Sequence, residues 1–190
     1  LKNSPSVITI QNLRRWLMKA SLADLHSFFL FDGVNVLLQM LQVAELCSRT
    51  TKSYAKQLEI LRVIRLICKQ KEGIQEILKV SNAVTYVLFN IHPNHVDLTC
   101  LIFEVIGELL WSSNVALELF LCSLTKLKAE KSHSFRFYPF LYILRQSNNV
   151  IMVENTVMFL NTLVASNVDS KWKVIIKSEL LACGIRDCLE

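Results

Sequence analysis

The chain has 190 residues, enough for one domain with a substantial core, and is 52% hydrophobic and 19% charged. This composition excludes intrinsic disorder, and four glycines and three prolines are too few for the turns of an all-β sandwich or barrel. The net charge of +5 is spread along the chain, so no nucleic-acid partner is expected. No transmembrane segment is expected either, because Glu104 and Glu108 interrupt the longest apolar run.

Signals for helix starts and for breaks follow one another along the chain. Pro5 suits the first turn of a helix, and Ser21 and Ser113 each precede an apolar helical segment. The apolar pattern breaks at 126–134 and again at the Ser-Asn-Asn run 147–149. We therefore expect helices that begin after these caps and loops at the two breaks.

Two kinds of helical segment recur. Three apolar helices of similar shape are predicted at 61–70, 103–113 and 157–166, and a short apolar helix opened by Gly or Ala is predicted at 32–41, 72–78, 82–91 and 183–189. Alternation of this kind, with a period of about 40 residues, is typical of armadillo and HEAT arrays, in which neighbouring units stack into a superhelix. The sequence predicts one all-α domain over 1–190, an armadillo-like right-handed α-solenoid of about four repeats.

The first two apolar helices carry opposite charges at matched positions. Arg65 aligns with Glu104 and Lys69 with Glu108, a spacing of 39 residues in both cases. Residues four apart project from one side of a helix. Because the last helix of an armadillo unit lines the concave face, these four side chains are predicted to form a ladder along one groove. The alternative, a solvated helix face with no partner, stays open.

The sequence offers no catalytic constellation. No glycine-rich phosphate loop is present, so neither an enzyme activity nor a cofactor is expected. His92 and His95 with Asp97 are the only cluster that resembles metal ligands, and Pro93 favours a plain turn between helices instead, so no metal site is expected. The six cysteines lie in apolar helical patterns without a C-x-x-C pair, which predicts reduced core residues of a cytosolic protein.

Several segments resemble one known family. These segments are LEILRVIRLICKQKEGIQEIL, FYPFLYILRQS, FLNTLVAS and WKVIIKSELLACGIRDCLE. They are similar, in the same order, to the armadillo-repeat region of diaphanous-type formins, known as the formin homology three region or diaphanous inhibitory domain. The most specific pieces are E-I-L-R with K-x-G-I at 59–74 and K-S-E-L-L-x-x-G-I at 177–185. The resemblance extends from about Pro5 to Glu190.

The resemblance implies a regulatory binding module in the cytoplasm, associated with the actin cytoskeleton. In such formins an active, GTP-bound Rho-family GTPase contacts the first armadillo helix and releases an amphipathic helix of the formin's own C-terminus from the concave face, while other domains assemble actin filaments. The positions facing the GTPase match Arg14, Arg15, Met18 and Lys19. The groove positions match Arg65, Lys69, Glu104, Val105, Glu108 and Trp111.

The chain departs from the family pattern at several of these positions. Arg15 replaces an apolar residue, and Met18-Lys19-Ala20 replaces an uncharged, Asn-rich stretch, so the GTPase contact would be more basic. Glu104 replaces a basic residue and Glu108 a small one, and a carboxylate buried there without a partner would cost several kcal/mol. The GTPase-binding subdomain that precedes the repeats is expected to be missing or reduced to residues 1–10. The chain opens on Leu1 rather than Met, and the dimerisation helices of the family are expected to follow Glu190, so the chain is expected to be a fragment of a longer protein.

A different function remains open beside this one. A generic armadillo or HEAT adaptor would bind an unrelated peptide and have no connection with actin. Adaptors of the nuclear-import type present regular Trp-Asn pairs on successive concave helices, and this chain offers Asn161 without a matching series of tryptophans. The resemblance therefore favours the formin module.

Overall fold

The structure is a computed structural model that describes residues 5–47, 51–165 and 169–188. Within these ranges every regular element is helical, and no strand occurs, which confirms the all-α prediction. The α-helices, in chain order, are α1 (Val7–Leu17), α2 (Leu22–Leu30), α3 (Gly33–Leu46), α4 (Thr51–Cys68), α5 (Lys71–Lys79), α6 (Ala83–Leu88), α7 (Val96–Ser112), α8 (Asn114–Glu130), α9 (Tyr138–Gln146), α10 (Val150–Ala165) and α11 (Ser170–Ala182).

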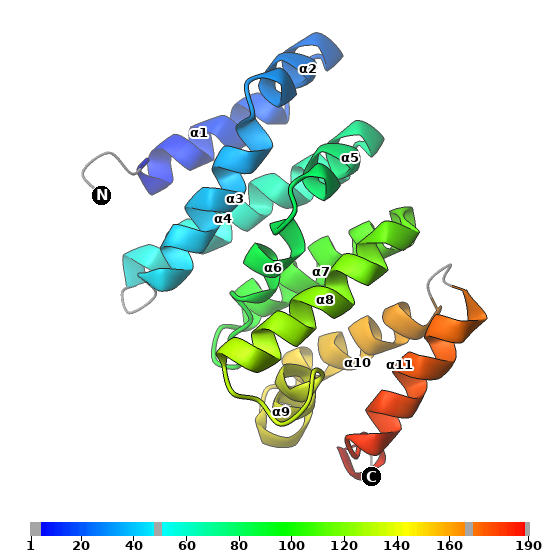
Figure 1. The fold of residues 1–190 in the computed structure, drawn as a ribbon. Coiled ribbons are helices and arrows are strands. Elements are labelled where there is room, and N and C mark those ends of the chain that lie inside the picture. Colours follow the sequence, from blue (N-terminus) through cyan, green and yellow to red (C-terminus); the bar gives the residue numbers. More distant parts are fainter. Residues whose placement is uncertain (1–4, 48–50, 166–168, 189–190) are drawn as a thin grey trace.

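The helices stack in two layers (Figure 1). One layer consists of α1, α4, α7 and α10, each of which packs on the next, and the other contains α3, α6 and α8. The chain thus repeats a three-helix unit as α2–α4, α5–α7 and α8–α10, with α1 and α11 flanking the series. One cluster of buried side chains runs through the stack from Ile10 to Leu180. This arrangement is an armadillo-like α-solenoid, as predicted.

The predicted serine caps are confirmed. The Ser21 hydroxyl accepts a hydrogen bond from the Asp24 amide at 3.2 Å, and the Asp24 carboxylate accepts one from the Ser21 amide at 3.0 Å, which closes a capping box on α2. Ser113 caps α8 by accepting from the amide of Val115. The prediction for Pro5 is wrong by two positions, because Ser6 is the cap and α1 begins after it.

Glycine is required near the start of two short helices because the neighbouring residues leave no room for a side chain. A Cβ atom on Gly33 would lie 2.3 Å from the ring of Phe28, and one on Gly73 would lie 2.3 Å from the backbone oxygen of Ile67 in the last turn of α4. The predicted segments 32–41, 72–78 and 82–91 correspond to α3, α5 and α6. The fourth prediction, at 183–189, is wrong over its described part, where Gly184 has φ 80° and a 3₁₀ turn follows at Arg186–Cys188.

The predicted loop at 126–134 is wrong over its first half. Helix α8 continues to Glu130, because Leu127 is buried three residues after the buried Leu124 and so keeps the helical period. Lys126, between these two leucines, is exposed, and it donates to the side chain of Asn82 at 2.9 Å. The break at 147–149 is confirmed, since it separates α9 from α10.

Taken one at a time, none of the helices described is both long and apolar enough to cross a membrane. The pair α2 and α3 passes that test only when the two helices are joined, and they are bent by 62° at the break between them.

Candidate functional site

The end of α1 presents an exposed basic patch. Arg15 and Lys19 are exposed, and Met18, at the C-cap of the helix, is 65% exposed. We call Arg15, Met18 and Lys19 the α1 patch. The side chain of Arg15 reaches back to the Asn12 carboxamide at 3.4 Å, a weak contact that leaves the guanidinium accessible. Three of the four residues that the family resemblance assigns to the GTPase contact are therefore available to a partner.

The fourth residue, Arg14, points into the layer. Its Nε lies 3.3 Å from an Oε2 of Glu59 on α4, and the two atoms are not aligned as a hydrogen bond, so this contact is electrostatic. Glu59 is 4% exposed and also accepts a hydrogen bond from Arg62 at 2.5 Å. Arg14 thus fixes α1 on α4 and contributes less surface than its neighbours. The contact between Arg14 and Glu59 was not predicted from the sequence. The pair of Glu59 and Arg62 could have been, because residues three apart are neighbours on one helix turn.

The predicted ladder exists at its first step. The Nε of Arg65 lies 2.6 Å from an Oε2 of Glu104, an ion pair that joins α4 to α7. Both side chains are about half exposed, so the pair lies on the surface of the layer. The 39-residue spacing therefore corresponds to real neighbours in adjacent units. We call the surface formed by Arg65, Lys69, Glu104, Glu108 and Trp111 the ladder face.

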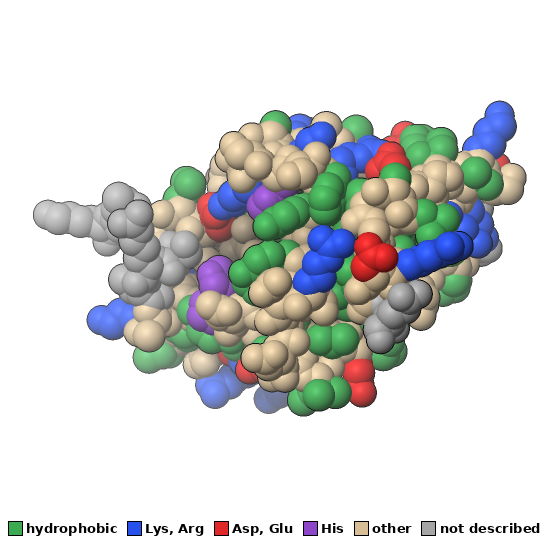
Figure 2. All heavy atoms as spheres, turned by 90° about the horizontal axis from the view of Figure 1, so that it is seen from below, with side chains coloured by type: hydrophobic (Ala, Val, Ile, Leu, Met, Phe, Trp, Pro, Cys, Tyr) green, Lys and Arg blue, Asp and Glu red, His purple; other side chains and the backbone are tan. Residues whose placement is uncertain are grey.

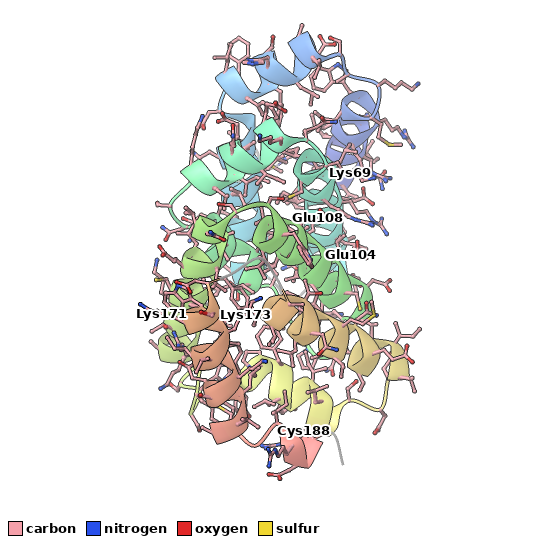
Figure 3. All side chains as sticks on the ribbon, turned by 90° about the vertical axis from the view of Figure 1, so that its right-hand side faces the viewer. Lys69, Glu104, Glu108, Lys171, Lys173 and Cys188 are labelled. Atoms are coloured by element: carbon pink, nitrogen blue, oxygen red, sulfur yellow. The ribbon has the colours of Figure 1, made fainter. Side chains whose placement is uncertain are left out.

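The second step of the ladder, Lys69 with Glu108, forms no ion pair. Lys69 and Glu108 lie on the same side of the stack as Glu104 (Figure 3), and neither side chain has an ion-pair partner among the described residues. Glu108 acts on the Cys68 thiol at the end of α4. Burial, followed by the negative charge of Glu108, raises the pKa of this thiol to about 12. Glu108 is therefore the carboxylate of the ladder face that a bound helix would cover without a partner from the chain itself.

The α1 patch and the ladder face meet at one shallow hollow. Met18 and Lys69 both line it, together with residues of α2 and the end of α4. Its volume is about 150 Å³, too small for a drug-sized ligand but suited to a single side chain. A protein bound at the α1 patch and a helix lying on the ladder face would therefore touch the same residues.

Val105 and Trp111, two other predicted groove residues, differ in their exposure to solvent. Val105 is fully buried, so the expectation that it lines the groove is wrong: it faces the core, opposite the charged side of α7. Trp111 is 53% exposed at the end of the same helix and is free to contact a partner. The difference follows from the helical period, since Val105 lies directly beside Glu104 in sequence and so points about 100° away from it.

The histidine segment and the cysteines are the remaining candidate sites. The segment with His92 and His95 forms a turn between α6 and α7, and no group of three potential metal ligands comes together within the part of the chain that the structure describes. The prediction that all cysteines are buried is wrong: only Cys68 is buried, whereas Cys47 and Cys122 are exposed and Cys100, Cys183 and Cys188 are half-buried. The apolar patterns predict which segments are helical, but they do not predict on which side of a helix, or how near its end, each cysteine lies.

Comparison with known proteins agrees with this geometry. The Diaphanous GTPase-binding Domain family model matches residues 1–111, which include the α1 patch and the whole ladder face. The chain is also similar to Formin-D of Dictyostelium discoideum, at 22% identity over 193 aligned residues. That alignment covers 100% of this chain but only 16% of Formin-D, so the chain spans about a sixth of the length of this relative. The chain belongs to the Diaphanous GTPase-binding domain family.

Proposed function

We propose that this chain is the regulatory module of a formin, and that it binds a Rho-family GTPase in its GTP-bound state. The match of residues 1–111 to the GTPase-binding family carries the proposal. The α1 patch would supply the contact: Arg15 and Lys19 would face acidic surface of the GTPase, and Met18 would supply apolar area. Arg14 would hold α1 in position through Glu59.

The ladder face is the proposed site for an amphipathic helix, either the C-terminal helix of the parent protein or one of similar chemistry. Such a helix would bury an apolar stripe near Trp111 and meet basic and then acidic side chains in turn. Because Met18 and Lys69 line the same hollow, binding of a GTPase at the α1 patch would compete with a helix at this end of the face. Actin assembly would belong to other domains of the parent protein, which we place in the cytoplasm at the actin cytoskeleton.

A charge-reversal experiment tests the GTPase contact. Association of the chain with Rho-family GTPases, loaded with a GTP analogue or with GDP, is measured by biolayer interferometry. We expect binding to the GTP form only, and an on-rate lowered on the order of 10-fold or more in the Arg15→Glu, Lys19→Glu variant, with the gap narrowing as salt is added.

The control carries the same change in net charge elsewhere. Lys171 and Lys177 are exposed on α11, and Lys171 lies on the other side of the stack from Lys69 (Figure 3). The Lys171→Glu, Lys177→Glu variant should therefore retain most of the on-rate. Equal losses in the two double variants would show that net charge, and not the α1 patch, governs association.

A peptide titration tests the ladder face. We expect a Leu-rich diaphanous tail peptide to bind the wild type weakly, because it would bury the Glu108 carboxylate without a partner. Glu108→Ala should tighten binding by about 1–3 kcal/mol, the usual penalty for an unsatisfied buried group. Glu118→Ala, which removes an exposed carboxylate from α8, is the matched control. Tight wild-type binding, or an equal gain in both variants, would contradict the assignment.

A further inference from the structure

A cleft of about 400 Å³ lies at the opposite end of α4 from the α1 patch. Its walls come from four elements that are distant in sequence: Tyr54 of α4, His95 before α7, His133 between α8 and α9, and Tyr138 of α9, with Asn90 behind them. We call it the aromatic cleft. Figure 2 shows histidine side chains on two sides of a hollow on this face. The volume lies within the usual range of sites for small ligands and single aromatic side chains.

Stacked rings form two of the walls. The rings of Tyr54 and His95 stack with centroids 4.3 Å apart, and those of His133 and Tyr138 stack at 4.4 Å. Tyr142 continues the second wall at 5.9 Å from Tyr138. Each ring stacks on its neighbour, so the walls present a flat aromatic surface before a ligand binds. Such walls favour a flat aromatic guest over an aliphatic one.

Asn90, which lines the cleft, has a buried hydrogen-bond acceptor without a donor among the described residues. The residue is 4% exposed, and its Nδ2 donates to the backbone oxygen of Tyr86 at 2.7 Å, which fixes the orientation of the amide. The Oδ1 atom makes no hydrogen bond with any described residue. A buried acceptor without a donor is unfavourable, so a guest that brings an N–H group is favoured over one of the same shape without it.

The carboxylate and the ammonium group that line the cleft cancel each other. These two charged residues, Glu45 and Lys131, form an ion pair of 3.1 Å. The Nδ1 of His92 accepts a hydrogen bond from the Asn94 amide at 3.2 Å, so that nitrogen carries no proton. Burial, followed by the neighbouring His95 and Lys131 for His92 and by Lys131 for His133, lowers the pKa of both imidazoles. A neutral guest therefore suits the cleft better than a charged one.

We propose that the aromatic cleft binds the indole ring of a tryptophan side chain in a partner protein, with the indole N–H donating to Oδ1 of Asn90. Among natural side chains, indole is flat, neutral and a donor without an acceptor, so it leaves no polar atom of its own unsatisfied. This site is independent of the proposed GTPase contact. Tyr54 and Cys68, where α4 ends beside the hollow shared by the α1 patch and the ladder face, are 14 residues apart on one helix, about 21 Å, so both sites can be occupied at once.

Three probes test the proposal on the wild-type chain, by titration followed in ¹H–¹⁵N NMR spectra. Indole and N-acetyl-tryptophan amide should bind saturably and shift the amide signals of cleft residues. Benzothiophene, which has the same shape with sulfur in place of N–H, should bind about 5- to 150-fold more weakly, the range expected for one unsatisfied buried acceptor. Equal binding of indole and benzothiophene would overturn the role of Asn90. Binding of indole without binding of the amide would overturn a chain-attached tryptophan as the guest.

Three aromatic-to-leucine variants locate the site. Tyr138→Leu removes a wall ring and should abolish saturable indole binding, whereas Phe31→Leu, at an 84% exposed position after α2, should leave it unchanged. Tyr142→Leu, at a 41% exposed position, weakens the same wall with less risk to folding and should lower affinity in the same direction. Unchanged affinity in both tyrosine variants, or no saturable binding by the wild type, would refute the site.

Discussion

Glu59 is the one charged side chain that is buried within the described residues, and its two arginine partners allow a sharp test of how α1 is held. Arg62 donates to one of its oxygens at 2.5 Å, and Arg14 lies 3.3 Å from the other. A buried carboxylate that loses every partner destabilises a fold by about 3–5 kcal/mol, whereas its replacement by an apolar residue of similar volume is often neutral. The effect of each arginine should therefore depend on whether the other is present.

The expected magnitudes follow from exposure and geometry. The two arginine side chains are 35% and 42% exposed, so solvent screens each contact, and either single change to Met should cost only about 1–2 kcal/mol. The Arg14→Met, Arg62→Met double variant should lose about 3–5 kcal/mol, because Glu59 then has no partner. Adding Glu59→Met should recover about 1–4 kcal/mol of that loss.

Urea denaturation followed by circular dichroism measures these differences as shifts of the midpoint at constant slope. Arg65→Met is the matched control, because it breaks an arginine–glutamate pair whose members are both about half exposed and should cost at most about 1 kcal/mol. If the triple variant is no more stable than the double variant, the loss comes from arginine packing and not from an unpaired carboxylate, and the reasoning is wrong.

Three further outcomes are expected. Ser21→Ala should lower the free energy of unfolding by about 1 kcal/mol through loss of the capping box, measured by urea denaturation, and an unchanged midpoint would contradict a role for the cap. Gly73→Ala should cost about 1–3 kcal/mol, because its Cβ would clash with the backbone of Ile67, and a stabilised variant would show that α5 shifts freely. The pKa values of His92 and His133 are lowered from 6.5, so the unfolded chain binds more protons below that pH and the stability of the fold should fall as pH drops through about 6.5. Substituting both by Gln should flatten this part of a melting-temperature profile, and a profile unchanged by the substitution would contradict the assignment.

Much of the architecture was predictable from the sequence. The helical period, the serine caps and the 39-residue spacing all depend on local chemistry or on a repeat, and both are visible in one chain. The ion pair between Arg65 and Glu104 is a direct result of that repeat, because matched positions of adjacent units become neighbours. The errors at 126–134 and 183–189 occurred where polar residues lie on the outside of a continuing helix or where a glycine ends one.

The details of the sites were less accessible for a physical reason. Whether Val105 faces the core or the groove depends on the rotation of α7, which a repeat fixes only to within one residue. The contact of Arg14 with Glu59 needs the crossing of α1 over α4, and the aromatic cleft needs α4, α7, α8 and α9 together. The periodicity of the sequence does not predict such contacts between side chains that are distant in the chain.

The order of charges along the layer has a consequence for the polarity of any bound helix. The exposed residues are basic on α1 and α4 and acidic on α7 at Glu104 and Glu108, and those on α10 include the acidic Glu154 as well as Met158, which is 65% exposed. The N-terminus of a helix carries partial positive charge and its C-terminus partial negative charge, each worth about 0.3–1 kcal/mol beside an opposite charge. A helix that lies across α1, α4, α7 and α10 is therefore expected to have its C-terminus at α1 and α4 and its N-terminus towards α7 and α10. In the reverse direction both ends would meet like charges, so the proposed site would select the direction of a bound helix as well as its apolar stripe.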